Sequence, residues 1–519
     1  MDRKQAVMDE ACVQEPASTV NAASGHSRDR SLVRSVAWNA LSDWVSQIFS
    51  WASFLVVMRL LTPADFGIAA MAMLLVPYLS YLSGFGIQRA VVILRDLTDE
   101  QLAQLNTVSF SFGIACFSLA AILAKPFAAF FHSPRLAPVM ICACIPLIHG
   151  GLQAVSTGWL AREMRFRLLS LIGAATAVVA AIVTLGTALL GLGYWALVIG
   201  NLVASLVRTV VVLRIRPCKL AWPHLNAIRE PLGFGWRSVI SMLALSSYQR
   251  LDNLVAGRRL GQSALGFYGT AWELAYVPIE KVTSLVTTVI PTYLAEVRNQ
   301  PAALRRYLRG LTEMVALATF PATVGLGIVA PELVPLAFGR KWEGMIGPLE
   351  VLSFYTTFRS IVALLPKLLT AVGEVHFVMW NDLAALIILP AAFYLGSFRG
   401  TTGIAWAWVV VYPFVAIPLY RKTFRTIDMK VGEYFRALRP ALEGTIVMIV
   451  VVELLKHGVP TLWPLPLRFA IEVTAGALAY FVTLRLLHRE RLMALWEIAR
   501  NLFPRGSRPR DSARVAIDR

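Results

Sequence analysis

The sequence predicts an all-α polytopic membrane protein of about fourteen transmembrane helices. Of its 519 residues, 57% are hydrophobic and only 15% are charged, whereas a soluble chain averages about 25% charged residues. The mean hydropathy is +0.62. From residue 36 almost to the end, apolar windows of about 20 residues recur, and a helix of that length crosses a hydrocarbon layer of roughly 30 Å. These three observations exclude an ordinary soluble domain.

Each apolar window is predicted to form one membrane-spanning helix. The fourteen windows lie at 36–58, 64–86, 105–125, 137–160, 168–190, 193–214, 236–257, 265–290, 311–331, 346–371, 377–396, 401–420, 440–456 and 463–484. Even the longest connection, 215–235, is too short to fold as a separate domain. The working surface is therefore expected within the helix bundle.

The two ends of the chain differ from its middle. Residues 1–35 are polar and rich in Ser and Ala, and they contain no apolar run, which predicts a disordered tail rather than a cleavable signal peptide. Residues 485–519 form a basic tail. Apolar residues lie among the first charged residues of this tail, which fits an amphipathic helix on the inner leaflet. The excess of basic residues on the cytoplasmic side of membrane proteins is the alternative explanation for the positive charge of the tail.

The basic residues predict the orientation of the chain. There are 49 Lys and Arg against 31 Asp and Glu, which gives a net charge of +18. In a soluble protein this excess would suggest binding to nucleic acid, but in a membrane protein the distribution of basic residues indicates which loops are cytoplasmic. Counted in and beside the connections and tails, 35 Lys and Arg fall on the side of both termini and 10 on the other. Both termini are therefore predicted to be cytoplasmic, and no nucleic-acid partner is expected.

Known catalytic and metal-binding patterns are missing from the sequence. The cysteines (Cys12, Cys116, Cys142, Cys144 and Cys218) form no C-x-x-C pair and are interpreted as inert apolar residues. There is no nucleotide-binding P-loop motif, no H-E-x-x-H and no G-x-S-x-G. We therefore expect no metal, no cofactor and no enzymatic activity.

A weak internal repeat predicts the domain organisation. Aligning Gly67 with Gly266 places RLLTPADFGIAAMA (59–72) on RRLGQSALGFYGTA (258–271), and both stretches join corresponding spans, the first to the second and the seventh to the eighth. Two parallel six-helix bundles follow from this offset, with two extra helices at the end. The predicted segments are 36–214 and 236–420 for the bundles, 215–235 for a cytoplasmic linker, 421–439 for a cytoplasmic loop and 440–484 for helices 13 and 14.

The turn in the first copy of the repeat carries a helix-start signal. Thr62 is placed to cap the second span, Pro63 is tolerated at the first helical position, and Asp65 is placed to reciprocate in a T-x-x-D capping box. This turn is predicted to be structural.

Four stretches together resemble a known family. They are RLLTPADFG (59–67), RLDNLVAGRRLGQSALGFYGTAWEL (250–274), VIPTYLAEVRNQPAALRRYLRG (289–310) and PELVPLAFGRKWEGMIGPLEVL (331–352). They resemble the bacterial polysaccharide transporters, the Wzx-type flippases of lipid-linked oligosaccharides, within the multidrug/oligosaccharidyl-lipid/polysaccharide exporter superfamily. The resemblance covers residues from about 31 to about 485.

This resemblance implies a fold and a function. The fold is fourteen helices, with two six-helix bundles around a central cavity that opens alternately to each side of the inner membrane. The implied substrate is an undecaprenyl-diphosphate-linked oligosaccharide for O-antigen, capsule or exopolysaccharide, delivered from the cytoplasmic to the outer leaflet. Membrane lipids, and possible contact with a polysaccharide polymerase or other assembly proteins, follow as partners. No short signature transfers site residues, so these are inferred from the chain itself.

Ionisable side chains inside the predicted spans are the site candidates. One near the bilayer centre costs about 2.5–3.5 kcal/mol to insert, so such residues normally face inward and are paired or functional. The candidates taken from such side chains are Asp43, Arg250, Asp252, Glu273, Glu280, Lys281, Arg359, Lys367 and Asp382. All four cations lie in the second half of the chain, which suits an anionic substrate.

Helical spacing sorts these candidates by face. Arg250 and Asp252 are two residues apart and point to different sides of a continuous helix. Each therefore needs a partner elsewhere, and Arg250 with Glu273 and Lys281 with Asp252 are the pairs to consider. On the eighth span, Glu273, Tyr276 and Glu280 recur at spacings of three and four and share one face.

The chemistry of a diphosphate assigns roles to them. Arg presents a planar fork to phosphate oxygens and Lys a compact point charge, while aromatic rings can lie against sugars. The substrate-binding candidates are Arg250, Arg359, Lys281, Lys367, Tyr248 and Tyr276, with Trp272 as a further ring. The candidates for ion coupling or structural pairing are Asp43, Asp252, Glu273, Glu280 and Asp382.

Three other classes remain open at this level. A drug or cation exporter of the same superfamily would want an acidic, aromatic cavity. A membrane glycosyltransferase or polymerase usually carries a sizeable extracytoplasmic loop or an acidic catalytic motif, and neither is visible in the sequence. A non-transporting scaffold in polysaccharide assembly remains the third alternative.

Overall fold

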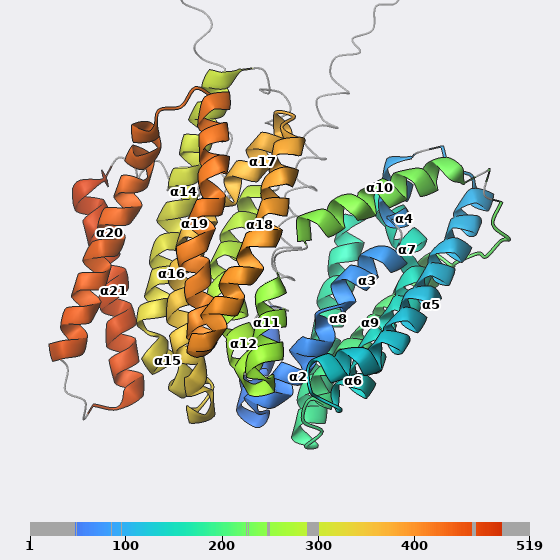
Figure 1. Cartoon of the computed structure of the whole chain (residues 1–519), viewed down its shortest axis with the longest axis horizontal. Coiled ribbons are helices and arrows are strands. Elements are labelled where there is room, and N and C mark those ends of the chain that lie inside the picture. Colours follow the sequence, from blue (N-terminus) through green and yellow to red (C-terminus); the bar gives the residue numbers. More distant parts are fainter. Residues whose placement is uncertain are drawn as a thin grey trace, which may run out of the picture.

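The computed structural model describes residues 47, 49–84, 86–94, 96–224, 226, 228–246, 250–287, 300–458 and 463–489. In this part of the chain the regular structure is helical, and no strand occurs. Figure 1 shows two groups of helices that stand side by side, meet closely at one end and diverge toward the other. We call them the first lobe, up to residue 215, and the second lobe, from residue 251 onward.

The first lobe contains the helices of the first six predicted spans and one short helix in a connection. They are the helix Phe49–Leu60, α2 (Pro63–Met73), α3 (Val76–Ser83), α4 (Ile87–Ile93), α5 (Asp99–Phe130), α6 (Leu136–Cys144), α7 (Pro146–Arg162), α8 (Phe166–Leu189) and α9 (Trp195–Ile215). The second span is thus divided between α2 and α3, and the fourth between α6 and α7.

The second lobe contains the remaining helices, and α10 (Arg229–Ser246) runs between the lobes (Figure 1). They are α11 (Leu251–Leu260), α12 (Gln262–Thr287), α14 (Pro301–Ile328), α15 (Ala330–Ala337), η2 (Arg340–Met345), α16 (Ile346–Val362), α17 (Leu364–Ala371), α18 (Val375–Gly396), η3 (Ser397–Arg399), α19 (Gly400–Thr426), α20 (Val431–Gly458) and α21 (Leu465–Leu487).

The prediction of one continuous helix over 236–257 was wrong. Helix α10 is described as far as Ser246, and residues 247–249 lie outside the described part of the chain. Helix α11 begins at Leu251 with Arg250 at its N-cap, where φ is −125° and ψ is 8°, so the backbone at Arg250 is not α-helical. The two helices have different neighbours: both contact α18, but α10 also lies against α3 and α4 of the first lobe, whereas α11 lies against α12. Apolar sequence on both sides of the break made it look like one span, so the helical faces inferred for Arg250 and Asp252 do not apply.

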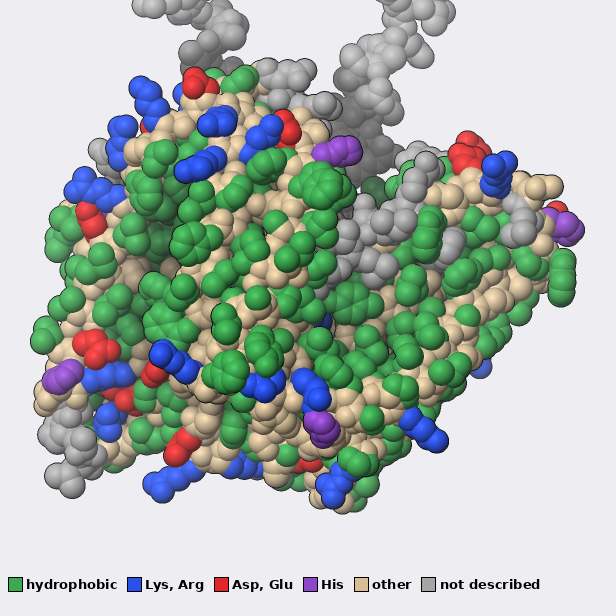
Figure 2. Space-filling model, viewed as in Figure 1, with side chains coloured by type: hydrophobic (Ala, Val, Ile, Leu, Met, Phe, Trp, Pro, Cys, Tyr) green, Lys and Arg blue, Asp and Glu red, His purple; other side chains and the backbone are tan. Residues whose placement is uncertain are grey.

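The surface is that of a multi-pass membrane protein. Nine helical segments within the described residues are long and apolar enough to cross a membrane. Figure 2 shows hydrophobic side chains in a broad band around the middle of the visible face, with most charged side chains near its two ends. A bilayer-embedded surface requires such a band. The number of fourteen crossings stays a prediction.

The predicted helix start at Thr62 is confirmed. Thr62 Oγ1 accepts a hydrogen bond from the Asp65 amide at 3.3 Å, and Asp65 Oδ2 accepts one from the Thr62 amide at 2.9 Å. Asp65 Oδ1 also accepts from the Tyr194 amide at 3.1 Å. The capping box therefore also ties α2 to the turn before α9.

The two glycines aligned in the repeat lie against each other between the lobes. A Cβ atom at Gly67 would lie 1.8 Å from the carbonyl oxygen of Gln262, and one at Gly266 would lie 1.9 Å from that of Pro63. Helices α2 and α12 therefore cross with their backbones in contact, which only glycine allows at these positions. This crossing joins the lobes at their closed end.

A reciprocal pair of helix caps reinforces the same junction. Arg59 Nε donates to the carbonyl of Ala337 at 2.9 Å, at the end of α15. In return, Lys341 Nζ donates to the carbonyl of Arg59 at 2.7 Å and Trp342 Nε1 to that of Met58 at 2.9 Å. Each lobe thus satisfies the unpaired carbonyls at a helix end of the other. We call the glycine crossing and these caps the seam.

Candidate functional site

A cavity of about 450 Å³ lies between the lobes. The helix Phe49–Leu60, α2 and α9 border it from the first lobe, and α11, α12, α16 and α19 border it from the second. Gly266, which belongs to the seam, is among its lining residues. The cavity therefore lies directly beside the place where the lobes meet.

The side of the cavity made by the first lobe is almost entirely apolar. We call it the first-lobe wall, and it consists of Phe54, Phe66, Ala69, Ala70, Met73, Leu74, Leu197 and Asn201. Among these residues Asn201 alone has a polar side chain, and it donates to the carbonyl of Leu197 at 3.3 Å. This wall offers contact to a non-polar surface and one amide.

The opposite side is polar and aromatic. We call it the second-lobe wall, and its side chains are Arg250, Asn253, Leu265, Thr270, Trp272, Glu273, Tyr276, Arg359 and Trp408. Every charged residue that lines the cavity among the described residues belongs to this wall. Helix α12 supplies most of the wall because Thr270, Glu273 and Tyr276 follow one another at spacings of three along one face.

Arg359 is held by aromatic rings. Its guanidinium carbon lies 5.8 Å from the ring centre of Trp272, 5.9 Å from that of Tyr276 and 6.0 Å from that of Tyr412. Its NH1 also donates to the hydroxyl of Tyr355 at 3.0 Å. Cation–π contacts of this kind are worth about 0.5–2 kcal/mol each, depending on solvation. They fix the position of the guanidinium on the second-lobe wall.

Asp252 lies behind the same wall, fully buried, at the centre of a hydrogen-bond network. Its Oδ2 accepts from the Tyr268 hydroxyl at 2.8 Å, from Trp272 Nε1 at 2.8 Å and from Trp408 Nε1 at 3.1 Å. Its Oδ1 accepts from the amide of Asn253 at 2.8 Å. All these partners are donors, so the arrangement suits the ionised carboxylate. Asp252 thereby fixes the indole rings of Trp272 and Trp408, which line the cavity.

This combination of walls matches a molecule with distinct chemical faces. Two guanidinium groups can bind phosphate oxygens, and amides and a carboxylate can bind hydroxyl groups. Phe54, Phe66 and Met73 can cover the C–H face of a pyranose ring. The cavity lacks the triad or metal arrangements of catalysis, and no metal-binding cluster is found among the residues that the structure describes.

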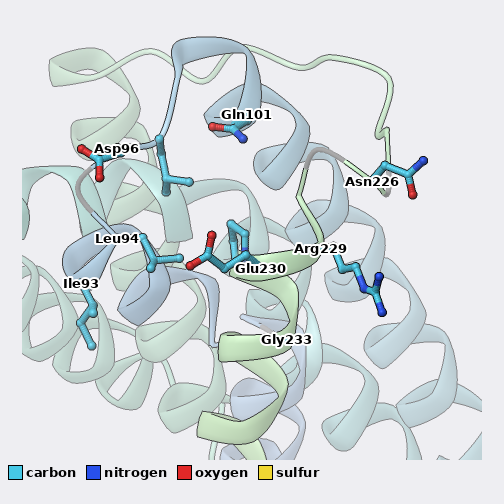
Figure 3. A pocket seen from close by; sticks show the side chains of 10 residues that line it. Ile93, Leu94, Asp96, Gln101, Asn226, Arg229, Glu230 and Gly233 are labelled. Atoms are coloured by element: carbon cyan, nitrogen blue, oxygen red, sulfur yellow. The ribbon is translucent and has the colours of Figure 1, made fainter.

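A second, wider pocket of about 950 Å³ lies at the far end of the first lobe, among α4, α5 and α10 (Figure 3). In Figure 3 the Glu230 and Arg229 side chains point in different directions rather than toward a common centre. Gln101 lines this pocket, but its side chain serves the capping box of α5 together with Thr98. The inter-lobe cavity is therefore the stronger candidate.

Comparison with known proteins agrees with this architecture. Residues 56–347, more than half of the chain, match the model of a family described as polysaccharide biosynthesis protein. The chain belongs to this family. The matched region runs from the first helix through the seam and includes most of the second-lobe wall, although Arg359 and Trp408 lie beyond it.

Individual relatives of the chain are distant from it in sequence. The succinoglycan biosynthesis transport protein ExoT of Rhizobium meliloti is 24% identical over 485 residues, which cover 92% of this chain and 97% of that protein. The lipopolysaccharide biosynthesis protein WzxC of Escherichia coli is 24% identical over 387 residues, or 72% of this chain and 77% of WzxC. The family resemblance predicted from the four motifs is thus confirmed.

Solved structures show the same fold. The lipid II flippase MurJ in an inward closed conformation aligns with a TM-score of 0.70 at 14% identity, over 88% of this chain and all of MurJ. An inward-facing multidrug transporter of the MATE family aligns with a TM-score of 0.58 at 14% identity, over 74% of this chain and 94% of the transporter. At this identity the likeness concerns the fold alone.

Five of the predicted site residues come together in the cavity. Its lining includes Arg250, Trp272, Glu273, Tyr276 and Arg359. Tyr248 and Asp43 lie outside the described residues. The substrate-binding or coupling roles of all these residues remain proposals.

The other predicted residues lie elsewhere. Lys281 does not line the cavity; its Nζ donates to Gln47 Oε1 at 2.9 Å. Lys367 is exposed on α17, Glu280 is exposed on α12, and Asp382 is half-buried on α18, all outside the cavity lining. The considered pairing of Lys281 with Asp252 was wrong, because neutral donors occupy the Asp252 carboxylate.

Sequence reasoning missed the first-lobe wall and four residues of the second-lobe wall, namely Asn253, Leu265, Thr270 and Trp408. Phe54, Phe66 and Asn201 carry no charge, so a search for intramembrane charges passed over them. Asn201 had a usable signal, since it is a polar amide in the middle of the apolar stretch 195–204 of the sixth span. Asn253 and Trp408 enter the site only because α11, α12 and α19 converge on Asp252.

Proposed function

We propose that this protein is a flippase that moves undecaprenyl-diphosphate-linked oligosaccharide units from the cytoplasmic to the outer leaflet of the bacterial inner membrane. The observation that carries the proposal is a cavity between two lobes with Arg250 and Arg359 on one wall and an apolar surface on the other. The transport and lipopolysaccharide names of ExoT and WzxC, and the MurJ-like fold, support the same reading. O-antigen, capsule and exopolysaccharide units are the candidate cargoes.

The proposed mechanism is alternating access between the lobes. Fourteen membrane helices, in two six-helix bundles and a final pair, would close on either side of the cavity in turn. We assign the diverging end to the cytoplasm, together with both termini, because the predicted cytoplasmic connections carry most of the Lys and Arg. The state described here would then be open inward, with the seam closing the outer side.

The membrane potential provides a driving force for this direction. Moving one negative charge outward across an inside-negative membrane releases about 2.3 kcal/mol per 100 mV. A diphosphate carries about two such charges, so ion antiport is not required. The task of the protein is then kinetic: the cavity replaces water around the headgroup, while the prenyl chain stays in lipid.

The decisive experiment measures flipping directly. The purified protein is reconstituted in liposomes with a fluorescent polyprenyl-diphosphate oligosaccharide, and the label is followed with a membrane-impermeant quencher. Arg250→Ala and Arg359→Ala are each expected to slow flipping at least tenfold, because each removes a phosphate-binding cation from the cavity. Lys367→Ala is the matched control, since this cation lies outside the cavity lining.

Each outcome has a distinct meaning. Equal flipping by the wild type and both arginine variants would remove the cavity from the mechanism. Absence of flipping by a folded wild-type protein, with export of a cationic dye instead, would favour the drug-exporter class. Absence of both activities, with specific capture of a polysaccharide polymerase, would favour an assembly scaffold.

A further inference from the structure

Glu273 is an acidic residue in a cavity proposed to bind an anion. It lies on α12 in the second-lobe wall, one turn from Tyr276, and its side chain is exposed to the cavity. Arg250 is close enough to interact with it electrostatically, but no salt bridge joins the two. Within the described part of the chain, no hydrogen bond engages the Glu273 carboxylate. This group is therefore available to whatever occupies the cavity.

The charges that line the cavity suggest which part of the substrate meets the Glu273 carboxylate, namely the glycan. Arg250 and Arg359 supply two positive charges, which match the roughly two negative charges of a diphosphate. A carboxylate accepts hydrogen bonds from sugar hydroxyl groups, but it repels a second carboxylate in the same confined space. The remaining polar groups, Asn253, Thr270 and Asn201, are neutral and so do not offset that repulsion.

The first-lobe wall limits how a sugar can avoid Glu273. Phe54, Phe66 and Met73 occupy the opposite side, and a charged substituent turned toward them would lose its hydration without gaining a partner. A sugar next to the diphosphate would therefore place its hydroxyl edge toward the second-lobe wall.

On the basis of the proposed function, we infer that Glu273 is a specificity-determining residue, which selects diphosphate-linked glycans whose diphosphate-proximal sugar is neutral and disfavours those with a uronic acid there. Two carboxylates about 6 Å apart in a partly hydrated cavity repel each other enough to change binding about tenfold. The selection acts on the sugar and not on the lipid or the diphosphate.

The test uses two fluorescent polyprenyl-diphosphate disaccharides that differ only in the proximal sugar, glucose in one and glucuronic acid in the other. Flipping of each is measured in liposomes at pH 8, so that the sugar carboxylate is ionised. The wild type is expected to flip the neutral lipid about tenfold faster at subsaturating concentration. Glu273→Gln keeps the size of the side chain and one acceptor oxygen, replaces the other oxygen with an NH₂ donor and removes the charge. It is expected to reduce the ratio to about twofold or less.

Glu280→Gln is the matched control, because it makes the same change on the same helix outside the cavity lining, and its preference ratio is expected to equal that of the wild type. Equal rates for both lipids in the wild type, or an unchanged ratio in Glu273→Gln, would overturn the inference and leave the flippase proposal standing. No flipping of either lipid by the wild type would instead refute the flippase proposal.

A second measurement needs no variant. Soluble short-chain analogues of the two lipids are added as competitors to the wild-type protein, and the inhibition of flipping of the fluorescent lipid by each analogue is measured at low and at high salt. Raising NaCl to about 0.5 M shortens the screening length to about 4 Å, so an electrostatic preference for the neutral analogue is expected to shrink. A preference that salt does not change would indicate steric selection and contradict the role of Glu273.

Discussion

The two walls of the cavity are built on opposite principles. The first-lobe wall presents aromatic and aliphatic side chains and a single amide, whereas the second-lobe wall presents two guanidinium groups, a carboxylate and several aromatic rings. The second-lobe wall is also the better supported of the two, because Asp252 fixes its indoles and three rings surround Arg359. Under the proposed function, the second lobe would position the polar headgroup and the first lobe would offer an apolar surface along which the headgroup moves.

The largest effect is expected from breaking the support of the second-lobe wall. Asp252→Asn places an amide NH₂ among hydroxyl and indole donors, so at least one buried donor loses its partner. Leaving a buried donor without a partner costs about 1–3 kcal/mol, and the remaining hydrogen bonds also lose the strength that the carboxylate charge gives them. We therefore expect a clear drop in thermal unfolding temperature in detergent. Asp382→Asn is the control, because this half-buried aspartate lies outside the network. Equal unfolding temperatures for the two variants would show that the network does not support the wall.

The junction between the walls is expected to be the next most sensitive. Gly67→Ala would place a Cβ 1.8 Å from the Gln262 carbonyl oxygen, so α2 and α12 must separate. We expect a loss of about 1–3 kcal/mol, measured by thermal unfolding, with a similar loss for Gly266→Ala. Gly310→Ala, in α14 with no atom within 4 Å of its Cβ, is expected to stabilise by about 0.5–1 kcal/mol. Unchanged thermal unfolding in both Gly67→Ala and Gly266→Ala would mean that α2 and α12 do not cross in contact in the membrane-embedded protein.

A smaller effect is expected from changing the cation while keeping its charge. Arg359→Lys retains a positive charge but loses the planar group that lies among three rings. We expect flipping of the fluorescent lipid to fall about fivefold to tenfold, less than in Arg359→Ala. The control is Arg399→Lys, at the N-cap of α19. If Arg359→Lys flips the lipid at the wild-type rate, only the positive charge at this position matters and the planar guanidinium group does not.

The smallest effects are expected on the first-lobe wall. Met73→Leu preserves an apolar side chain of similar volume, and we expect flipping to change less than twofold. Asn201→Ala removes the one amide of this wall, and a decrease of about twofold to threefold is expected from the loss of one hydrogen bond. Both are measured in the same liposome assay. Losses as large as that of Arg359→Ala would contradict the proposed division of roles between the walls.

Much of the fold could be predicted from hydropathy alone. Helices overlap each predicted window from the second to the last, because a membrane leaves the backbone little alternative to helix wherever about 20 apolar residues occur. The capping box at Thr62 was equally predictable, since it depends on residues three apart. The non-α-helical backbone at Arg250 was not predictable, because it depends on the neighbours against which α10 and α11 pack.

The sequence by itself determined the class of the protein, its polar candidates and their bias toward the second half of the chain. Amino-acid composition and helical periodicity suffice for these features, because the class of the protein depends on the surrounding solvent and the spacing of side chains depends on local helix geometry. Only the tertiary structure decided which candidates share a cavity. It placed Arg250, Glu273 and Arg359 in the lining of one cavity, it left Lys281 and Lys367 outside, and it buried Asp252 behind the second-lobe wall. Those outcomes depend on contacts between helices more than 100 residues apart, such as Asp252 with Trp408, and spacing along a single helix carries no information about them.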